Sequence, residues 1–208
     1  AVTARYYDAE TGDFAKNVQG ANAFAVDLGL GDARTYRNMA EHYRALGCYD
    51  TGIFATDIVT RLLFAHGDGD VAAALLTSHT ENGSYGHMQD LGATTLYEYW
   101  GAYARSYNHP MFGAAARYLF RYLLGIGQPE GACGWRRVTI CPVLVPQLTR
   151  AAGYVAVPAG RIAVSYEKRA DSVFFTVTVP DGIDAEFSAC GVRKKLGAGV
   201  TSFTVLLA

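Results

Sequence analysis

The first part of the chain carries hydrophobic residues at helical spacing. Apolar positions recur three and four residues apart, the pattern of an amphipathic helix. Asp32 and Asp68 are suitable N-caps, Gly47 is a stop signal, and Pro110 suits a first helical position. The predicted helices span residues 21–30, 33–46, from Asp50 or Thr51 to about 66, 71–78 and 110–124.

After Gly127 the pattern changes to alternation of apolar and polar residues, which is typical of strands. Glycine- and proline-containing turn signals at 158–160, 180–182 and 197–199 separate the segments. We expect the basic run Arg193–Lys195 to be a solvated hairpin turn. The predicted strands are 135–140, 161–168, 172–179, 185–189 and 201–207. Several short strands at this spacing favour an antiparallel sandwich.

The two patterns together predict an α+β, multidomain chain, with helical hairpins in residues 1–126 and a small antiparallel β-sandwich in residues 127–208. The third predicted helix is apolar on much of its surface, which suits a helix covered on more than one side. Five helices with short loops close poorly into a bundle. We therefore expect part of a larger helical array with an exposed apolar face, covered by the rest of a parent chain or by self-association.

Composition argues against two classes of protein, nucleic-acid binders and membrane-spanning proteins. With 18 Lys and Arg against 19 Asp and Glu, the chain lacks the basic footprint of a nucleic-acid binder. No apolar run reaches the roughly 18 residues of a membrane span, and residues 1–7 show no signal core, so a cytoplasmic location is favoured. Because Met is absent at position 1, we expect a chain that is processed or cut from a longer one.

Metal and cofactor signals are weak. The histidines lack ligand spacing, the cysteines form no zinc pattern, and Gly125–Gly127 is a helix stop without a preceding strand, so neither a metal nor a cofactor is expected. We expect buried or half-buried thiols at the four cysteines: Cys48, Cys133, Cys141 and Cys190.

Residues 83–113 are the least regular part of the chain and the richest in polar and aromatic side chains. Glu98 is flanked by Tyr97, Tyr99 and Trp100, and a carboxylate in an aromatic environment is suited to acid–base chemistry. The alternative is a solvent-facing glutamate at the start of a helix or strand. We interpret the acidic residues nearer the N-terminus, Asp8, Glu10 and Asp13, as turn and solvent charges, and Asp90 as a turn residue.

Several motifs resemble, in order and spacing, segments of bacterial α-L-rhamnosidases (glycoside hydrolase family 78). Residues 92–100, GATTLYEYW, are similar to the family's GATT-[I/L]-WE-x-W segment, and residues 107–113, YNHPMFG, to its S-x-N-H-x-x-[F/M]-G segment. Further similar segments are residues 6–12, 19–25, 51–56, 134–142 and 160–166. The resemblance covers nearly the whole chain.

The resemblance implies the end of an (α/α)6 barrel followed by a C-terminal β-sandwich, and inverting hydrolysis of terminal α-L-rhamnosides. In the family, the glutamate of the GATT segment is assigned as the general base, which is Glu98 here. The histidine of the second segment, His109, is expected to hydrogen-bond the sugar; the alternative is helix capping beside Pro110. Tyr85 and Trp100 are expected to stack on the sugar, with core packing as their alternative, and Tyr97 is placed in the same subsite.

Two departures from the family pattern bear on specificity, because Tyr97 replaces a tryptophan and Tyr99 replaces an arginine. The family's general acid lies upstream in the barrel and has no equivalent in these residues, so we expect this segment alone to be inactive. Two alternatives stay open: a non-catalytic carbohydrate-binding or structural module, and a related (α/α)6 glycosidase acting on another sugar.

Overall fold

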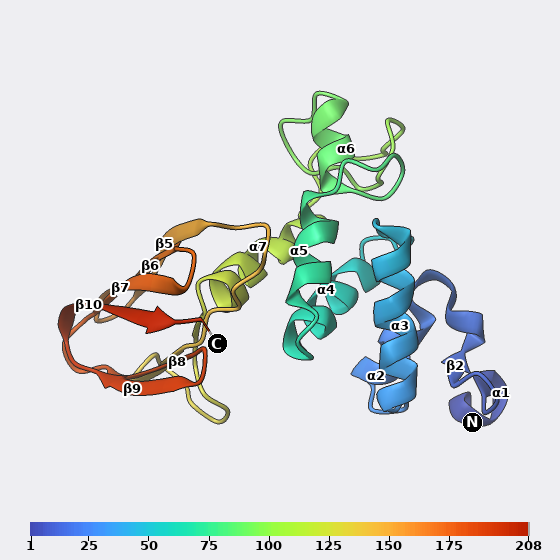
Figure 1. The fold of residues 1–208 in the computed structure, drawn as a ribbon. Helices are drawn as coiled ribbons and strands as arrows, with labels where there is room; N and C mark the ends of the chain where they lie inside the picture. The colour runs from blue at the N-terminus through green and yellow to red at the C-terminus, as the bar shows by residue number, and fades with distance from the viewer. Residues whose placement is uncertain (208) are drawn as a thin grey trace. The chain divides into compact units, whose positions relative to one another are not determined.

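The computed structural model describes residues 1–207 and contains two compact units, Ala1–Ala115 and Ala116–Ala208. The first is mainly helical and the second is mainly β-sheet, as the ribbon shows (Figure 1). The change from helical to strand periodicity therefore corresponds to a change of architecture. The expected boundary near residue 127 stays a prediction.

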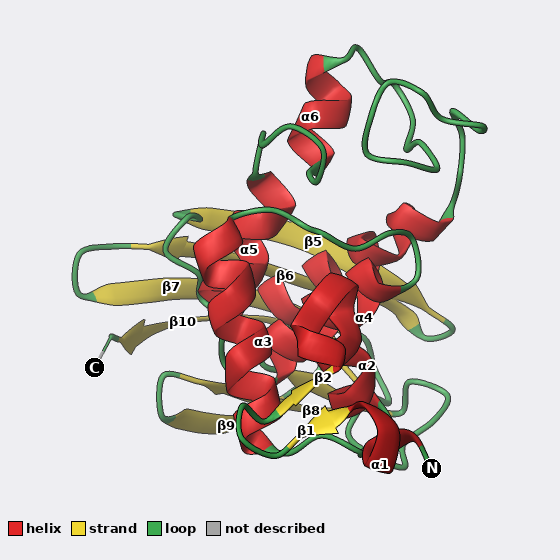
Figure 2. Cartoon of the chain, turned by 90° about the vertical axis from the view of Figure 1, so that its right-hand side faces the viewer, coloured by secondary structure: helices red, strands yellow, loops and turns green. Residues whose placement is uncertain are grey.

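Helices dominate the first unit (Figure 2). Its α-helices are α1 (Val2–Tyr6), α2 (Ala21–Asp27), α3 (Ala33–Leu46), α4 (Ala55–Ala65), α5 (Gly69–Thr77) and α6 (Tyr85–Asp90). Two 3-10 helices, η1 (Ala15–Gly20) and η2 (Met111–Ala115), and a hairpin of β1 (Tyr7–Asp8) and β2 (Asp13–Phe14) complete it.

Helix α3 has the bounds that the sequence predicts. The Asp32 carboxylate accepts hydrogen bonds from the backbone N–H groups of Arg34 and Thr35, and the Thr35 hydroxyl pairs with the Asp32 N–H in a capping box. Gly47 ends the helix at φ +70°, a conformation that glycine adopts without steric cost.

Other helices differ from expectation. Helix α4 begins at Ala55 rather than at Asp50 or Thr51. In its first turn the Thr56 hydroxyl donates to the Gly52 carbonyl at 2.9 Å and pairs with the Thr51 hydroxyl. The expected helix over 110–124 is irregular: η2 is followed by one α-turn, α7 (Ala116–Tyr118), and one π-turn, η3 (Leu119–Leu123). Helix α6 was not predicted, because six residues are too few to show a helical period. Its N-cap signal is Ser84, whose hydroxyl accepts from the His87 N–H at 3.1 Å.

The second unit contains two four-stranded sheets. One has the order β10-β7-β6-β5 and is antiparallel throughout; the other has the order β3-β4-β8-β9. The strands are β3 (Ile126–Gly127), β4 (Arg137–Ile140), β5 (Arg150–Val157), β6 (Gly160–Lys168), β7 (Ser172–Val179), β8 (Asp184–Ala189), β9 (Val192–Leu196) and β10 (Gly199–Leu206).

Three details of this unit correct the sequence analysis. Strands β4 and β8 pair in parallel, so the second sheet is mixed. Strand β5 was not predicted. The basic run Arg193–Lys195 is not a turn but lies inside β9, where the backbone pairs with β8 and the charged side chains remain mostly exposed.

Strand β7 shows how alternation builds the core between the sheets. Val173, Phe175 and Val177 are fully buried, whereas Phe174 and Thr176 are half-buried on the other face. The Phe175 ring packs at centroid distances of 4.9 Å from Phe187 and 5.7 Å from Phe203. Aromatic packing of this kind is a main source of stability in such a core.

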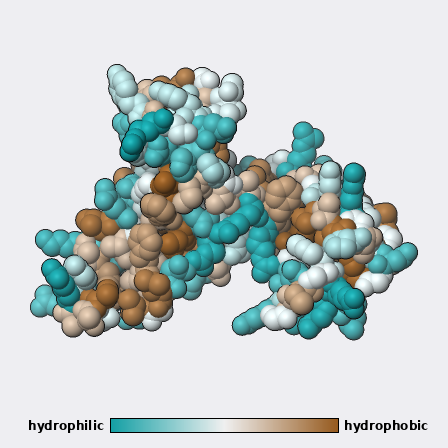
Figure 3. Space-filling view, turned by 180° about the vertical axis from the view of Figure 1, so that it is seen from behind, coloured by the Kyte–Doolittle hydropathy of each residue, from teal (hydrophilic) through white to brown (hydrophobic). Residues whose placement is uncertain are grey.

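Large hydrophobic side chains also lie exposed on the helical unit, and Figure 3 shows hydrophobic atoms gathered on one face of it. Phe54 and Leu28 are each 69% exposed. The exposed set in this unit also includes Val2, Tyr6, Val18, Phe24, Leu30, Leu46, Leu91, Tyr99, Tyr103, Tyr107 and Met111. A covering partner for these residues stays a prediction.

The four cysteines differ in their exposure to solvent. All four cysteines are free, but only Cys48 and Cys190 are buried or half-buried; Cys133 and Cys141 are exposed, so the expectation of burial was wrong for these two. Within residues 1–207, no helix combines the length and the apolar character of a membrane span.

Candidate functional site

The motif residues lie on a long connection between α6 and η2. Residues 91–110 contain neither a helix nor a strand, but two backbone hydrogen bonds draw their two halves together. The Glu98 N–H donates to the Ser106 carbonyl at 2.9 Å, and the His109 N–H donates to the Leu96 carbonyl at 2.8 Å. The segments that carry Glu98 and His109 therefore run side by side.

The Glu98 side chain is half-buried, and its carboxylate has no hydrogen bond or ion pair with any other part of residues 1–207. A carboxylate without a protein partner keeps its lone pairs available for water or for a substrate hydroxyl. This arrangement suits a group that accepts a proton.

His109 is half-buried, and its Nδ1 accepts a long hydrogen bond, 3.4 Å, from the Met111 N–H at the start of η2. This contact is the capping role that the sequence leaves open as an alternative. When Nδ1 of a neutral imidazole accepts, the proton resides on Nε2. The same ring can therefore cap η2 through one nitrogen and donate to a ligand through the other.

Trp100 and Tyr85 belong to an aromatic cluster with Tyr49 and Phe112. The indole of Trp100 lies 5.6 Å from the Tyr49 ring in parallel orientation, 4.0 Å from Phe112, and edge-on to Tyr85 at 5.1 Å, measured between centroids. Its Nε1–H donates to the Thr51 carbonyl at 2.6 Å.

Two further contacts complete this aromatic region. The Tyr85 hydroxyl donates to the Phe112 carbonyl at 2.9 Å. Tyr97 packs edge-on against Tyr107 at 4.7 Å. Of the five residues singled out from the sequence, the structure thus brings Trp100 and Tyr85 into direct contact, whereas Tyr97 packs within the loop.

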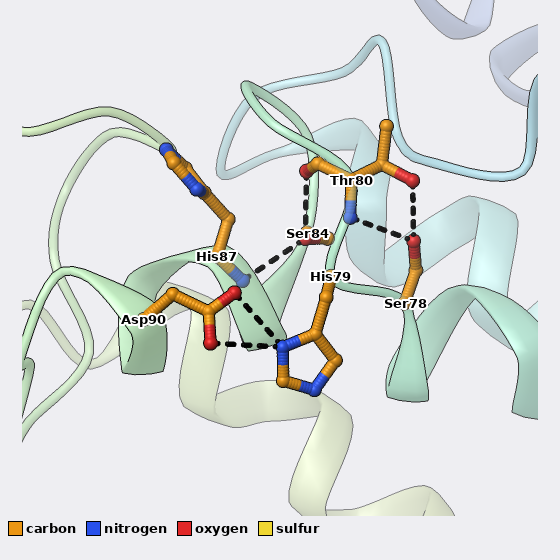
Figure 4. Close-up of polar contacts among 6 residues, drawn as sticks. All are labelled: Ser78, His79, Thr80, Ser84, His87 and Asp90. Carbon is orange, nitrogen blue, oxygen red and sulfur yellow. Dashed lines mark hydrogen bonds and ion pairs between the residues drawn. The ribbon is translucent and has the colours of Figure 1, made fainter.

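The entrance to the connection is held by polar contacts around α6 (Figure 4). The His79 Nδ1 lies 2.9 Å from a carboxylate oxygen of Asp90, so the two ends of the segment that contains α6 are tied together. Asp90 thus has a specific partner in addition to its place at the end of the helix. The Ser84 hydroxyl caps α6 and donates to the Thr80 carbonyl at 2.8 Å.

Other carboxylates in the helical unit already have partners. Asp50 accepts from the Tyr43 hydroxyl at 2.8 Å and lies 3.0 Å from His42 Nε2. Asp13 is not a solvent charge, as we expected from the sequence, because it is half-buried and accepts from the amides of Asn22 and Asn38. Asp8 is a turn residue as expected, since it accepts from the Glu10 N–H.

Sequence reasoning missed the residues that hold the motif loop, which is the connection of residues 91–110. Tyr49 and Thr51 hold Trp100, and nothing in their local pattern marks them for that role. Among residues 1–207, no cluster of three or more His, Cys, Asp or Glu side chains is arranged to hold a metal ion.

Two family profiles match consecutive parts of the chain. Residues 1–123 match the family profile described as the bacterial alpha-L-rhamnosidase six-hairpin glycosidase domain. Residues 125–203 match that of the bacterial alpha-L-rhamnosidase C-terminal domain.

Curated relatives are larger proteins. An alpha-L-rhamnosidase of Alteromonas sp. (strain LOR) is 31% identical over 147 residues, which cover 66% of this chain and 16% of the relative. An alpha-L-rhamnosidase of Formosa agariphila is 28% identical over 146 residues, covering 65% of this chain and 15% of the relative. The chain spans about one sixth of the length of these relatives.

Solved structures share the fold. The alpha-L-rhamnosidase of Dictyoglumus thermophilum matches with a TM-score of 0.87 at 20% identity, over 99% of this chain and 27% of that one. The alpha-L-rhamnosidase of Streptomyces avermitilis, solved in complex with L-rhamnose, matches with a TM-score of 0.85 at 22% identity, over 98% and 23%. Since the two family profiles together cover almost all of its length, this chain belongs to the bacterial α-L-rhamnosidase family, with the end of the six-hairpin glycosidase domain followed by the C-terminal domain.

Proposed function

We propose that this chain forms part of an inverting glycoside hydrolase that removes terminal α-L-rhamnosyl groups, and that Glu98 is its general base. The single observation that carries the proposal is the half-buried Glu98 carboxylate, which lacks a partner among residues 1–207 and lies in the GATT segment of a rhamnosidase-family chain. The relative solved with L-rhamnose supports the choice of sugar.

Inversion needs two carboxyl groups on opposite sides of the scissile bond, about 6.5–9.5 Å apart. Glu98 accepts a proton from water as that water attacks the anomeric carbon, and the glycosidic bond breaks toward a leaving oxygen that the general acid protonates. We place that acid outside residues 1–208, in the remainder of a six-hairpin domain.

The other site residues have supporting roles in this proposal. His109 donates from Nε2 to a sugar hydroxyl, and Tyr97 forms an aromatic wall of the rhamnose subsite. Tyr85 and Trp100 back this wall, since each already packs against other rings.

The test uses a polypeptide that joins these residues to a complete six-hairpin domain. In Glu98→Gln, kcat for an aryl α-L-rhamnoside is expected to fall by roughly 10²–10⁴, the range for loss of one acid–base group. Glu81→Gln is the matched control, because Glu81 is an exposed glutamate just before α6. Wild-type activity in Glu98→Gln would refute the assignment.

A second measurement identifies the base rather than a generally damaged site. In Glu98→Ala, azide is expected to restore turnover by attacking the anomeric carbon directly, which gives a β-rhamnosyl azide of inverted configuration. A retained α-configuration would contradict inversion. A wild-type protein that binds rhamnose without hydrolysing any rhamnoside would favour the carbohydrate-binding module instead.

A further inference from the structure

We propose that Trp100 is a positioning residue: its indole N–H, bound to the Thr51 carbonyl, holds the motif loop against the start of α4 and thereby fixes the Glu98 carboxylate. This inference rests on the proposed role of Glu98 as the base. It assigns to Trp100 and Thr51 a task different from stacking on the sugar.

Trp100 attaches the loop to the rest of the helical unit. The backbone bonds of Glu98 and His109 join one part of the loop to another, as does the bond from the Tyr107 hydroxyl to the Ala102 carbonyl at 2.9 Å. The hydrogen bond of Trp100 with Thr51 connects the loop to the segment just before α4. The internal bonds shape the loop, whereas this contact sets its place on the helices.

The contact of Trp100 with Thr51 is short and packed between aromatic rings. At 2.6 Å the N–H···O distance is short, and packing against Phe112 and Tyr49 restricts the indole to one orientation. A half-buried hydrogen bond that is braced by rings resists displacement better than an exposed one.

Thr51, the acceptor of this hydrogen bond, is itself held in place. Thr51 is 3% exposed, and its hydroxyl pairs with that of Thr56 in the first turn of α4 at 2.8 Å. Tyr49, on the other side, pairs through its hydroxyl with Thr60 one turn further along the same helix at 2.8 Å. The loop is therefore anchored to a buried part of α4.

Glu98 depends on this anchor because its carboxylate has no hydrogen-bond or ion-pair partner of its own among residues 1–207. The Cα atoms of residues two positions apart lie at most about 7 Å from each other, even in an extended chain. Trp100 and Glu98 therefore move nearly together. A displacement of about 1 Å at a reacting group can cost roughly 100-fold in rate. Loss of the anchor should therefore reduce the chemical step while leaving sugar binding largely intact.

The experiment is a double-mutant cycle of Trp100→Phe and Glu98→Gln in the polypeptide with a complete six-hairpin domain. Phenylalanine keeps an aromatic ring and removes only the N–H donor. We expect kcat to fall roughly 10- to 100-fold in Trp100→Phe, with KM within about threefold of wild type. Adding Trp100→Phe to Glu98→Gln should cost less than twofold more, because the residue to be positioned is already disabled.

A control on the same loop separates positioning from general damage. Tyr103→Ala changes a ring that is 95% exposed. It should keep kcat within about twofold of wild type. Circular dichroism and the thermal midpoint of each variant report folding.

The results distinguish the positioning role of Trp100 from the base role of Glu98. A Trp100→Phe enzyme with near-normal kcat, effects that multiply in the double mutant, or loss of the fold would each overturn the positioning role. Normal activity in Glu98→Gln would instead refute the base assignment and, with it, this inference. A reduced kcat in Glu98→Gln together with a normal kcat in Trp100→Phe would refute the positioning role but not the base assignment.

Discussion

Two adjacent phenylalanines on β7 provide a matched test of the sandwich. Phe175 faces the core and is fully buried, whereas Phe174 faces the other side of the sheet and is half-buried, with the Arg169 guanidinium 5.5 Å from its ring centre. Truncation of either to alanine removes the same atoms. Any difference in stability therefore reports which face is buried.

The expected losses of stability follow from how deeply each ring is buried. Phe175→Ala removes contacts with Phe187 and Phe203 and leaves a cavity, at an expected cost of about 3–5 kcal/mol. Phe174→Ala opens no enclosed cavity and should cost about 1 kcal/mol or less. At about 1.4 kcal/mol per factor of ten, the first change raises the open population of the sandwich roughly 100- to 4000-fold.

Hydrogen exchange followed by mass spectrometry measures this difference in the two variants. Peptides from β6, β7 and β10 should lose protection strongly in Phe175→Ala and only slightly in Phe174→Ala. Peptides from α3 serve as an internal control, because α3 belongs to the other compact unit. Equal losses in the two variants, or a larger loss in Phe174→Ala, would refute the assigned faces of β7.

Three further predictions concern the helical unit. Asp32→Ala removes the capping box of α3 and should lower its stability by about 1 kcal/mol, seen as faster exchange of residues 33–46; unchanged exchange would argue against the cap. Gly20→Ala should destabilise by about 1–3 kcal/mol, because φ is +80° and a Cβ would lie 2.9 Å from Thr51 Cγ2, whereas Gly52→Ala, with open space around it, should be nearly neutral in thermal melts. Burial acts to raise the pKa of the Asp13 carboxyl, but hydrogen bonds from Asn22 and Asn38 outweigh it and hold that pKa below its ordinary value. The folded state therefore gains stability that is complete above the unfolded pKa, about 3.9, and is lost as the pH falls through the lower folded pKa. Asp13→Asn should lower the melting temperature at pH 7 and weaken its decline in acid, and an unaltered pH profile would contradict this account.

Local chemistry is enough to predict the elements with strong signals. Helix α3 has both a capping aspartate and a terminal glycine, and β6, β7, β8 and β10 show clear alternation, so their positions follow from neighbouring residues. The order and spacing of the motifs along the chain also indicate the family, which the matches over residues 1–123 and 125–203 confirm. Residues 91–110, within the stretch that the sequence marks as the least regular, contain neither a helix nor a strand.

Tertiary structure decided the features that depend on residues far apart in the chain. Strands β5 and β9 form because partners in β6 and β8 supply their hydrogen bonds, although their own alternation is weak or carries charges. The parallel pairing of β4 with β8 joins segments more than 40 residues apart, which no local pattern encodes.

The same reason explains which residues of the site the sequence indicates and which it does not. The sequence marks Glu98 and Trp100 by their motif, but the Thr51 carbonyl that receives the indole N–H is 49 residues away. A backbone acceptor has no sequence signature, because every residue carries one. Asp13 likewise looks like a solvent charge in the sequence, and only the fold brings Asn22 and Asn38 to its carboxylate.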